Sequence, residues 1–469
     1  MSQETIIPEA EWSESTLLQD TAPFAFRGLE ESVKLSKRGL KPGEKEAYYG
    51  PKSGKIEPSE TLLGVSGSLG TMPPHVEKKH DVSKPFIVKL HRKEAKVPSA
   101  ALLQDPAQIG KATLTNNANT QYFGKVAVGT PAKEFTVVFD TGSSVLWVPD
   151  AQCKSEACKS HKQFSLHGST TGVLLGEDED EVKEATIQYG TGKMVGVEAQ
   201  DVVRIGDANG LAMPKSGILL ATQEEDAVFS NFPFDGVFGL NRRSVMSGGL
   251  DFNVMKAAKD SGSVKENIVA FWLGGAPGEN GGAIAIGGVD QRFIETPMSW
   301  HPVTANEFGN WMLKLDSLKI GDVEVCPGGC TTIIDTGTSL LVASQKVHDK
   351  LAPAMPIDAS CASAGSGKAL TFTYNGKQFP LRPEDYTIEM VDDSGGKACS
   401  SAISAMEGNL LSKMDTIAPE SDGRVIIMGD VFLRRVYTAF DNSNPDKPRV
   451  GFAMAKDAAA VDFDQIFAN

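Results

Sequence analysis

The sequence lacks the features of several protein classes. None of its apolar runs approaches the roughly 20 residues that a helix needs to cross a bilayer, and its first residues are polar and acidic, without the apolar stretch of a signal peptide. Its seven histidines form no metal-ligand spacing, and no Asn-x-Ser/Thr sequon occurs. The formal net charge is −14. These absences argue against a membrane span, a metal site, N-glycosylation and nucleic acid as the main partner.

The acidic charge is distributed unevenly along the 469 residues. Residues 1–100 hold 15 basic and 14 acidic side chains, which leaves 31 basic and 46 acidic side chains for the remainder. A chain of this length is sufficient for two or three domains. We therefore expect a nearly neutral N-terminal extension followed by a strongly acidic globular part.

Short strands separated by glycine-containing turns recur after residue 114, whereas long amphipathic helices are scarce. This pattern predicts an all-β protein. Residues 1–83 are instead rich in Glu, Lys, Ser, Gly and Pro, so we expect loose packing there, with a helix near 29–40. Apolar and basic residues alternate over Ile87–Lys93, which predicts a basic strand. The other expected strands cover 124–128, 135–140, 185–189, 196–205, 282–287 and 311–320, and short helices are expected over 254–261, 344–351 and 383–389.

The tripeptide Asp-Thr-Gly occurs twice, each time after a run of β-branched and other apolar residues. The copies begin at Asp140 and at Asp335, and each is followed by a hydroxyl residue and a serine. The matching contexts indicate an internal duplication that brings the two carboxylates to one pseudo-twofold axis. Two carboxylates that share a proton can activate water without a metal or a covalent nucleophile. The alternative is a pair of strand-end turns without catalytic function.

Further motifs surround these copies in a defined order. The first half contains Gln121-Tyr122-Phe123-Gly124, Gly129-Thr130-Pro131 and Leu146-Trp147-Val148-Pro149. This order resembles the pepsin-like aspartic proteases, over about residues 114–455. The resemblance implies an all-β, bilobal fold with pseudo-twofold related lobes. The implied divisions are an N-terminal extension and prosegment over 1–100, an N-terminal lobe over 101–296, and a C-terminal lobe with a short tail over 297–469.

The resemblance also assigns functions to the residues around the two aspartates. The ionised member of the pair, Asp140 or Asp335, would accept a proton from water, and the protonated member would polarise the scissile carbonyl. The threonines of the two motifs would hydrogen-bond across the axis, the glycines would allow close backbone approach, and the hydroxyl residues that follow would bond the outer carboxylate oxygens. These supporting residues are Thr141, Gly142, Ser143, Thr336, Gly337 and Thr338.

Residues 187–192 resemble the flap, a hairpin that closes over the substrate cleft in this family. We expect Tyr189 to cover the substrate and to bond Trp147, whose indole N–H is only a donor. Main-chain groups of Gly190 and Thr191 would bind the substrate backbone. A turn with a core tyrosine is the alternative reading. Lys193 differs from the small hydroxyl residue common after the flap tip, and it places a charge near the mouth of the cleft.

The six cysteines fall into three pairs by their spacing, and the family closes the same three loops with disulfides. The alternative is a set of free buried thiols. Disulfides would indicate the secretory pathway, an endolysosomal or vacuolar compartment, or the extracellular space. The expected pairs are Cys153 with Cys158, Cys326 with Cys330, and Cys361 with Cys399.

Together these features predict a monomeric aspartic endopeptidase in zymogen form. It would cleave at bulky hydrophobic residues at acid pH, need no cofactor, and bind pepstatin-like inhibitors. The Lys-Tyr pair that covers the dyad in many zymogens is missing near Ser99–Ala101, so Lys96 or the region Lys45–Tyr49 could replace it. Self-cleavage is expected within 96–111. A catalytically silent pepsin-like binding protein and a lectin-like β-sandwich are the rival readings.

Overall fold

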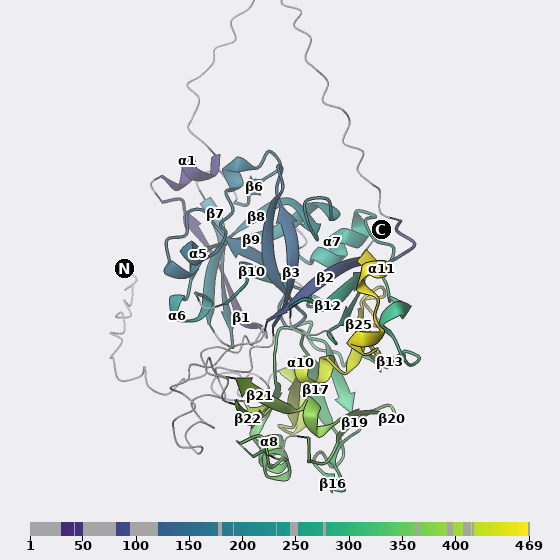
Figure 1. The fold of residues 1–469 in the computed structure, drawn as a ribbon. Coiled ribbons are helices and arrows are strands. Elements are labelled where there is room, and N and C mark those ends of the chain that lie inside the picture. The colour runs from purple at the N-terminus through teal and green to yellow at the C-terminus, as the bar shows by residue number, and fades with distance from the viewer. Residues whose placement is uncertain are drawn as a thin grey trace, which may run out of the picture.

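The protein consists mainly of β-strands in a computed structural model (Figure 1), which confirms the all-β prediction. The expected self-cleavage region 96–111 lies outside the described residues. The structure describes residues 30–41, 43–49, 81–93, 121–176, 181–190, 192–230, 232–243, 252–274, 278–358, 360–362, 365–391, 397–406, 414 and 417–467.

One sheet of 15 strands contains strands from both halves of the sequence. Its order is β1-β7-β8-β9-β5-β10-β4-β3-β2-β12-β11-β25-β26-β13, and β6 pairs with β8. The sheet therefore connects the segment that carries Asp140 with the C-terminal strands. Its members are β1 (Glu30–Gly39), β2 (Phe86–Lys93), β3 (Gln121–Val128), β4 (Lys133–Asp140), β5 (Leu146–Pro149), β6 (Val173–Leu174), β7 (Glu181–Tyr189), β8 (Lys193–Ile205), β9 (Leu211–Glu224), β10 (Gly236–Gly239), β11 (Ile268–Trp272), β12 (Gly278–Ile286), β13 (Ser299–Pro302), β25 (Val436–Asp441) and β26 (Arg449–Met454).

Three smaller sheets form the lower body in Figure 1. Their orders are β14-β17-β24-β18-β23, β16-β15-β19-β20 and β21-β22. The first of them carries the second Asp-Thr-Gly copy at the end of β17. The strands are β14 (Met312–Leu315), β15 (Ser317–Ile320), β16 (Val323–Glu324), β17 (Cys330–Ile334), β18 (Leu341–Ala343), β19 (Leu370–Tyr374), β20 (Lys377–Leu381), β21 (Thr387–Val391), β22 (Lys397–Ser401), β23 (Ile403–Ala405) and β24 (Val425–Met428).

The described helices are short, and none of them is long and apolar enough to span a membrane. Two of them, α7 and α8, lie where the sequence predicts helices. The α-helices are α1 (Glu44–Tyr49), α5 (Glu156–Ser160), α6 (Asp226–Phe229), α7 (Val254–Asp260), α8 (Gln345–Leu351), α10 (Asp430–Leu433) and α11 (Phe463–Phe467). The 3-10 turns are η2 (Leu166–Gly168), η3 (Gln291–Phe293), η4 (Ala352–Ala354), η5 (Pro383–Asp385), η6 (Pro419–Ser421) and η7 (Ala458–Ala460).

Two predicted helices are wrong. Residues 30–39 form the strand β1, in which Val33 and Leu35 alternate with polar residues and pair with β7. This alternation has the period of a strand, and the partner is distant in the sequence. The expected helix over 383–389 is only the turn η5, because the chain then enters β21 and pairs with β22.

The predicted basic strand is confirmed as β2, and it has neighbours on both sides. It pairs with β12 along most of its length and with β3 at His91–Lys93. Val88 and Leu90 are buried, whereas the alternating side chains of Ile87, Lys89 and His91 are half-buried. Strand β2 is therefore an interior strand that completes the sheet between β3 and β12.

All three expected disulfides are present: Cys153–Cys158, Cys326–Cys330 and Cys361–Cys399. The alternative of free buried thiols is therefore wrong for these cysteines.

Several carboxyl groups outside the Asp-Thr-Gly loops are buried in the N-terminal half. Burial raises the pKa of Asp150 to about 6 and that of Glu198 to about 7. Burial, with the nearby charges of Asp226 and Asp235, raises the pKa of Glu224 to about 8. A raised folded-state pKa means that the folded protein binds the proton more tightly than the unfolded chain does. The stability from these groups is complete below their ordinary pKa and is lost as the pH rises through the folded value.

The free energy of unfolding should therefore fall as the pH rises from about 4.5 to about 8, and Glu224 should account for part of the fall. In Glu224→Gln the neutral amide keeps the volume but cannot ionise, so the decline should become shallower, by up to a few kcal/mol. Thermal or urea unfolding across this pH range measures it. Glu156→Gln, at an exposed ion pair, is the matched control. Parallel curves for Glu224→Gln and the parent chain would contradict the expectation.

Candidate active site

Each Asp-Thr-Gly copy leaves the end of a strand that has a second strand parallel to it. Gly239 of β10 aligns with Asp140 of β4, and Met428 of β24 aligns with Ile334 of β17. The Leu240 amide donates to the Asp140 carbonyl at 2.7 Å, and the Asp335 amide donates to the Met428 carbonyl at 3.1 Å. The backbone of each aspartate is thus fixed from behind by a separate segment of the chain.

Glycine is required where each of these segments leaves its strand. A Cβ atom at Gly239 would lie 2.3 Å from the Val145 nitrogen, and one at Gly429 would lie 2.2 Å from the Thr338 carbonyl oxygen. Real Cβ atoms do not come so near to backbone atoms. These glycines lie in two segments of mostly apolar residues, 234–240 and 426–433, which are therefore suited to the close packing that supports the two loops.

The two loops are joined by reciprocal hydrogen bonds of their threonines. The Thr141 amide donates to Thr336 Oγ1 at 3.0 Å, and the Thr336 amide donates to Thr141 Oγ1 at 3.0 Å. Each hydroxyl then donates to a carbonyl of the opposite half, Thr141 to Ile334 at 3.0 Å and Thr336 to Phe139 at 2.7 Å. All four bonds are buried and related by pseudo-twofold symmetry. They fix the separation and orientation of the two Asp-Thr-Gly loops.

Each carboxylate accepts a hydrogen bond from the glycine of its own motif. The Gly142 amide donates to Asp140 Oδ1 at 2.8 Å, and the Gly337 amide donates to Asp335 Oδ1 at 2.9 Å. Thr338 Oγ1 donates to Asp335 Oδ2 at 2.7 Å. Ser143, which was expected to bond the outer oxygen of Asp140, lies beside that carboxyl group and opposes the rise of its pKa, but the buried Ser143 hydroxyl and Asp140 Oδ2 make no hydrogen bond of regular geometry. The arrangement is therefore symmetric in its backbone and unequal in its outer oxygens.

The carboxyl groups of Asp140 and Asp335 lie close enough to influence each other. A Cβ atom at Gly142 would lie only 2.7 Å from Asp335 Oδ1, so the first loop contacts the second carboxylate. Both aspartates are completely buried. Burial and the charge of Asp335 raise the pKa of Asp140 well above its ordinary value, and burial raises the pKa of Asp335 although Thr338 and Gly337 oppose it. Such a pair titrates as a unit and retains a proton.

The residues expected in the flap lie in the hairpin of β7 and β8. Trp147 Nε1 donates to the Tyr189 hydroxyl at 2.7 Å, and both rings are buried. The Tyr189 amide donates to the Gly192 carbonyl at 2.8 Å and closes the turn around Gly190. Thr191 lies outside the described residues. Lys193 follows the turn with an exposed side chain, and its amide donates to Glu225 at 3.0 Å.

Asp430 is a buried carboxyl group near this site that the sequence analysis did not single out. Its amide donates to the Thr338 carbonyl at 2.8 Å. Burial raises its pKa well above the ordinary value; the charges of Arg434 and Arg92 oppose the rise, and that of Asp335 adds to it. The sequence did contain a signal for this residue, because a carboxylate directly after Gly429 stands in an otherwise apolar segment. Arg92 belongs to β2, so the basic strand acts electrostatically on the second loop.

The sequence matches the family described as "Eukaryotic aspartyl protease" over residues 121–455. It is similar to pepsin A of Sus scrofa, with 35% identity over 356 residues that cover 74% of this chain and 84% of the pepsin. It is also similar to pepsin-3 of Oryctolagus cuniculus, with 34% identity over 74% of this chain and 84% of the relative. For chymosin of Camelus dromedarius the identity is 33%, again over 74% of this chain and 84% of the relative.

The match covers both Asp-Thr-Gly loops, the strands that support them and the flap hairpin. The lectin-like alternative is therefore wrong. The chain belongs to the eukaryotic aspartyl proteases, as an all-β, pepsin-like endopeptidase that hydrolyses peptide bonds.

Proposed function

We propose that Asp140 and Asp335 are the catalytic dyad of this protease and that they activate one water molecule between them. The observation that carries the proposal is the reciprocal hydrogen bonding of Thr141 and Thr336, which holds two buried carboxyl groups in contact. The extension 1–100 precedes the two lobes, 101–296 and 297–469, and each lobe contributes one aspartate. No metal or organic cofactor takes part in the proposed reaction.

The dyad works with one proton on two carboxyl groups. The ionised group accepts a proton from the water as the oxygen attacks the scissile carbonyl, and the protonated group donates to the carbonyl oxygen. The tetrahedral intermediate then collapses when a carboxyl group protonates the leaving amine and the C–N bond breaks. Thr338, Gly337 and Gly142 stabilise the ionised form through the hydrogen bonds that they donate.

The flap supports a preference for bulky hydrophobic residues at the cleavage site. Tyr189 and Trp147 belong to a buried apolar cluster with Phe229, Phe232 and Phe234. The ring of Phe229 meets that of Trp147 edge-on, with 5.6 Å between centroids. A large apolar side chain next to this cluster would gain free energy from burial. Tyr189, Gly190 and Thr191 would contact the substrate directly.

The N-terminal extension indicates how the enzyme is kept inactive, and the disulfides indicate where it works. Strand β2 carries basic charge into an acidic body, and Arg92 acts on Asp430 near the second loop. We infer a zymogen in which attraction of this kind weakens when carboxylates are protonated. Three disulfides fit an oxidising secretory, endolysosomal or extracellular location. The enzyme is proposed to act as a monomer and to bind pepstatin-like inhibitors.

Hydrolysis of acid-denatured haemoglobin at pH 4, with and without pepstatin, tests this proposal against the rival of a silent binding protein. The protease should release peptides, and pepstatin should suppress their release. A properly folded chain that binds pepstatin and releases no peptide, even after acid treatment, would support the silent binding protein.

The first prediction from the proposed function concerns the dyad. Asp140→Asn and Asp335→Asn should each lower kcat/KM by roughly 10³-fold or more, because each removes a group that the other cannot replace. Peptide hydrolysis measures the loss, and circular dichroism checks the fold. Asp260→Asn, which changes an exposed carboxylate paired with Lys256, is the matched control and should retain activity. Turnover like that of the parent chain in either dyad variant would refute the assignment.

The second prediction concerns pH. Because the pKa values of Asp140 and Asp335 are both raised, the pair should keep one proton above the ordinary value of 3.8. The rate should peak on the acid side and fall toward neutrality as that proton leaves. The profile of kcat/KM from about pH 3 to about pH 8 measures this, with circular dichroism at each pH to separate titration from unfolding. A rate that rises steadily through pH 8 would exclude a shared proton.

A further inference from the structure

The outer edge of the flap hairpin is covered by a strand from the N-terminal extension. Strand β1 pairs antiparallel with β7 from Gly39↔Glu181 to Glu30↔Tyr189, so the pairing reaches the flap tyrosine itself. Figure 1 shows β1 along this side of the molecule, and in the sheet order β7 follows β1 directly. Without β1, β7 would be the last strand at this end of the described sheet.

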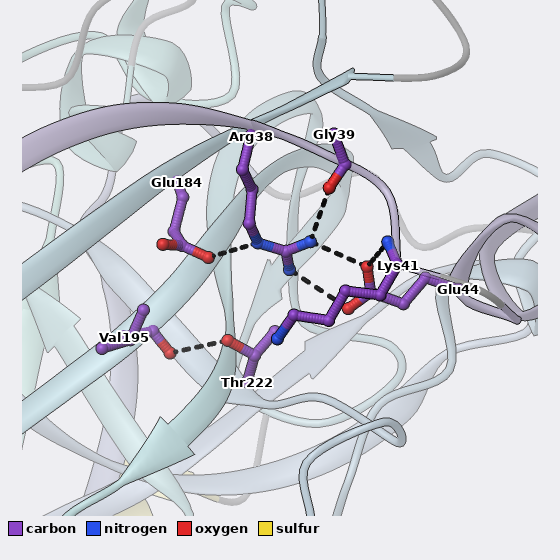
Figure 2. Close-up of polar contacts among 7 residues, drawn as sticks. All are labelled: Arg38, Gly39, Lys41, Glu44, Glu184, Val195 and Thr222. Carbon is purple, nitrogen blue, oxygen red and sulfur yellow. Dashed lines mark hydrogen bonds and ion pairs between the residues drawn. The ribbon is translucent and has the colours of Figure 1, made fainter.

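Ion pairs fasten β1 to the flap strand and to its own helix (Figure 2). Arg38 Nε donates to Glu184 of β7 at 2.7 Å, while Arg38 Nη1 donates to Glu44 of α1 at 2.7 Å. The Lys41 amide also donates to Glu44, at 2.6 Å. The three charged side chains of the ion pairs are only 15–21% exposed, so water screens them less than it screens a surface pair. Arg38 thus connects β1 to both α1 and the flap strand β7.

Apolar contacts at both ends hold the same segment. Val33 packs against the buried cluster that contains Ile187, Tyr189 and Trp147. At the other end Tyr48 of α1 is 5% exposed and lies beside Asp150, and α1 contacts η2. Residues 45–49 were considered as a replacement for the missing Lys-Tyr pair. Tyr48 of this region lies beside Asp150 instead, where it anchors α1.

We propose that β1 and α1 form a strap, residues 30–49, that holds the flap closed and limits access of protein substrates until the strap is released. The inference rests on the proposed function of the flap around Tyr189. Strand β8 of this hairpin already pairs with β9 from Met194↔Glu224 onward, so the outer edge of β7 is the side that, among the described strands, β1 alone covers. Once β1 pairs along this edge, the hairpin can move only if it carries β1 with it or breaks the pairing. Charge favours the attachment at Arg38, which lies between Glu184 of β7 and Glu44 of α1.

This restraint should discriminate between substrates by size. A short peptide needs only a small opening of the flap, but a denatured protein chain must pass beneath it with segments on both sides. The strap should therefore slow the hydrolysis of proteins more than that of short peptides. Residues 50–80 belong to the segment that connects the strap to β2 in the sequence. Cleavage within this segment would convert the strap into a separate peptide that can dissociate.

Hydrogen exchange tests the strap without relying on catalysis. In Arg38→Glu both ion pairs become repulsions, so the amides of peptides covering 181–195 should exchange about 3–10-fold faster. Lys34→Glu is the matched control, since it makes the same charge change at an exposed position of the same strand, and it should have a much smaller effect. Exchange in Arg38→Glu as slow as in the parent chain would overturn the proposal.

A reversible crosslink tests the functional consequence in the full chain. Lys37 and Lys183 are direct partners in the antiparallel pair, where Cα atoms are about 4.5–5.5 Å apart, within the range of a disulfide. Oxidised Lys37→Cys/Lys183→Cys should hydrolyse denatured haemoglobin several-fold more slowly than its reduced form, with a smaller change for a short peptide. The parent chain in the same reductant controls for the native disulfides.

Equal rates on denatured haemoglobin for the oxidised and reduced forms would refute the strap as a restraint. If no form of the chain, the parent included, hydrolyses any substrate, the proposed dyad function fails. The exchange experiment still decides whether the strap holds the flap in that case.

Discussion

The reciprocal hydrogen bonds of Thr141 and Thr336 are the constraint on which the rest of the site depends. Each threonine uses its amide and its hydroxyl across the pseudo-twofold axis, so neither Asp-Thr-Gly loop can move without breaking buried bonds. Buried polar groups that lose a partner cost more free energy than a typical bond contributes. This asymmetry holds two carboxyl groups together that would otherwise separate to lower their repulsion.

Burial of carboxyl groups connects the site with the remainder of the N-terminal half. The raised pKa values of Asp140 and Asp335 have the same main cause as those of Glu198 and Glu224, namely the loss of water around the charged form. A fold that is most stable when these groups are protonated suits a dyad that needs a proton. Stability and the proposed catalysis thus favour the same pH range.

Local motifs explain why much of this could be predicted from the sequence. The Asp-Thr-Gly copies and the basic strand β2 each carry their signal within a few residues, as do the two disulfides between cysteines 5 and 4 positions apart. The third disulfide, Cys361–Cys399, spans 38 positions and was expected from the resemblance to the family. The strand β1 could not be identified in this way, because its partner β7 is about 150 residues away and its alternation of Val33 and Leu35 is short. The helix predicted over 383–389 was wrong for a similar reason, since pairing of β21 with β22 overrides the local helix preference.

Because β1 pairs with a strand that lies far away in the sequence, it connects the N-terminal extension directly to the flap. Glu184 and Tyr189 lie on one strand, so a segment that binds the first through Arg38 necessarily extends toward the second. A leader attached only at β2 would lie in the sheet between β3 and β12 and would leave the flap strand uncovered on its outer side. The described strands of the N-terminal region therefore join the sheet at two positions, with different physical consequences. Strand β2 adds basic charge near Asp430, whereas β1 adds stiffness to the hairpin that must move.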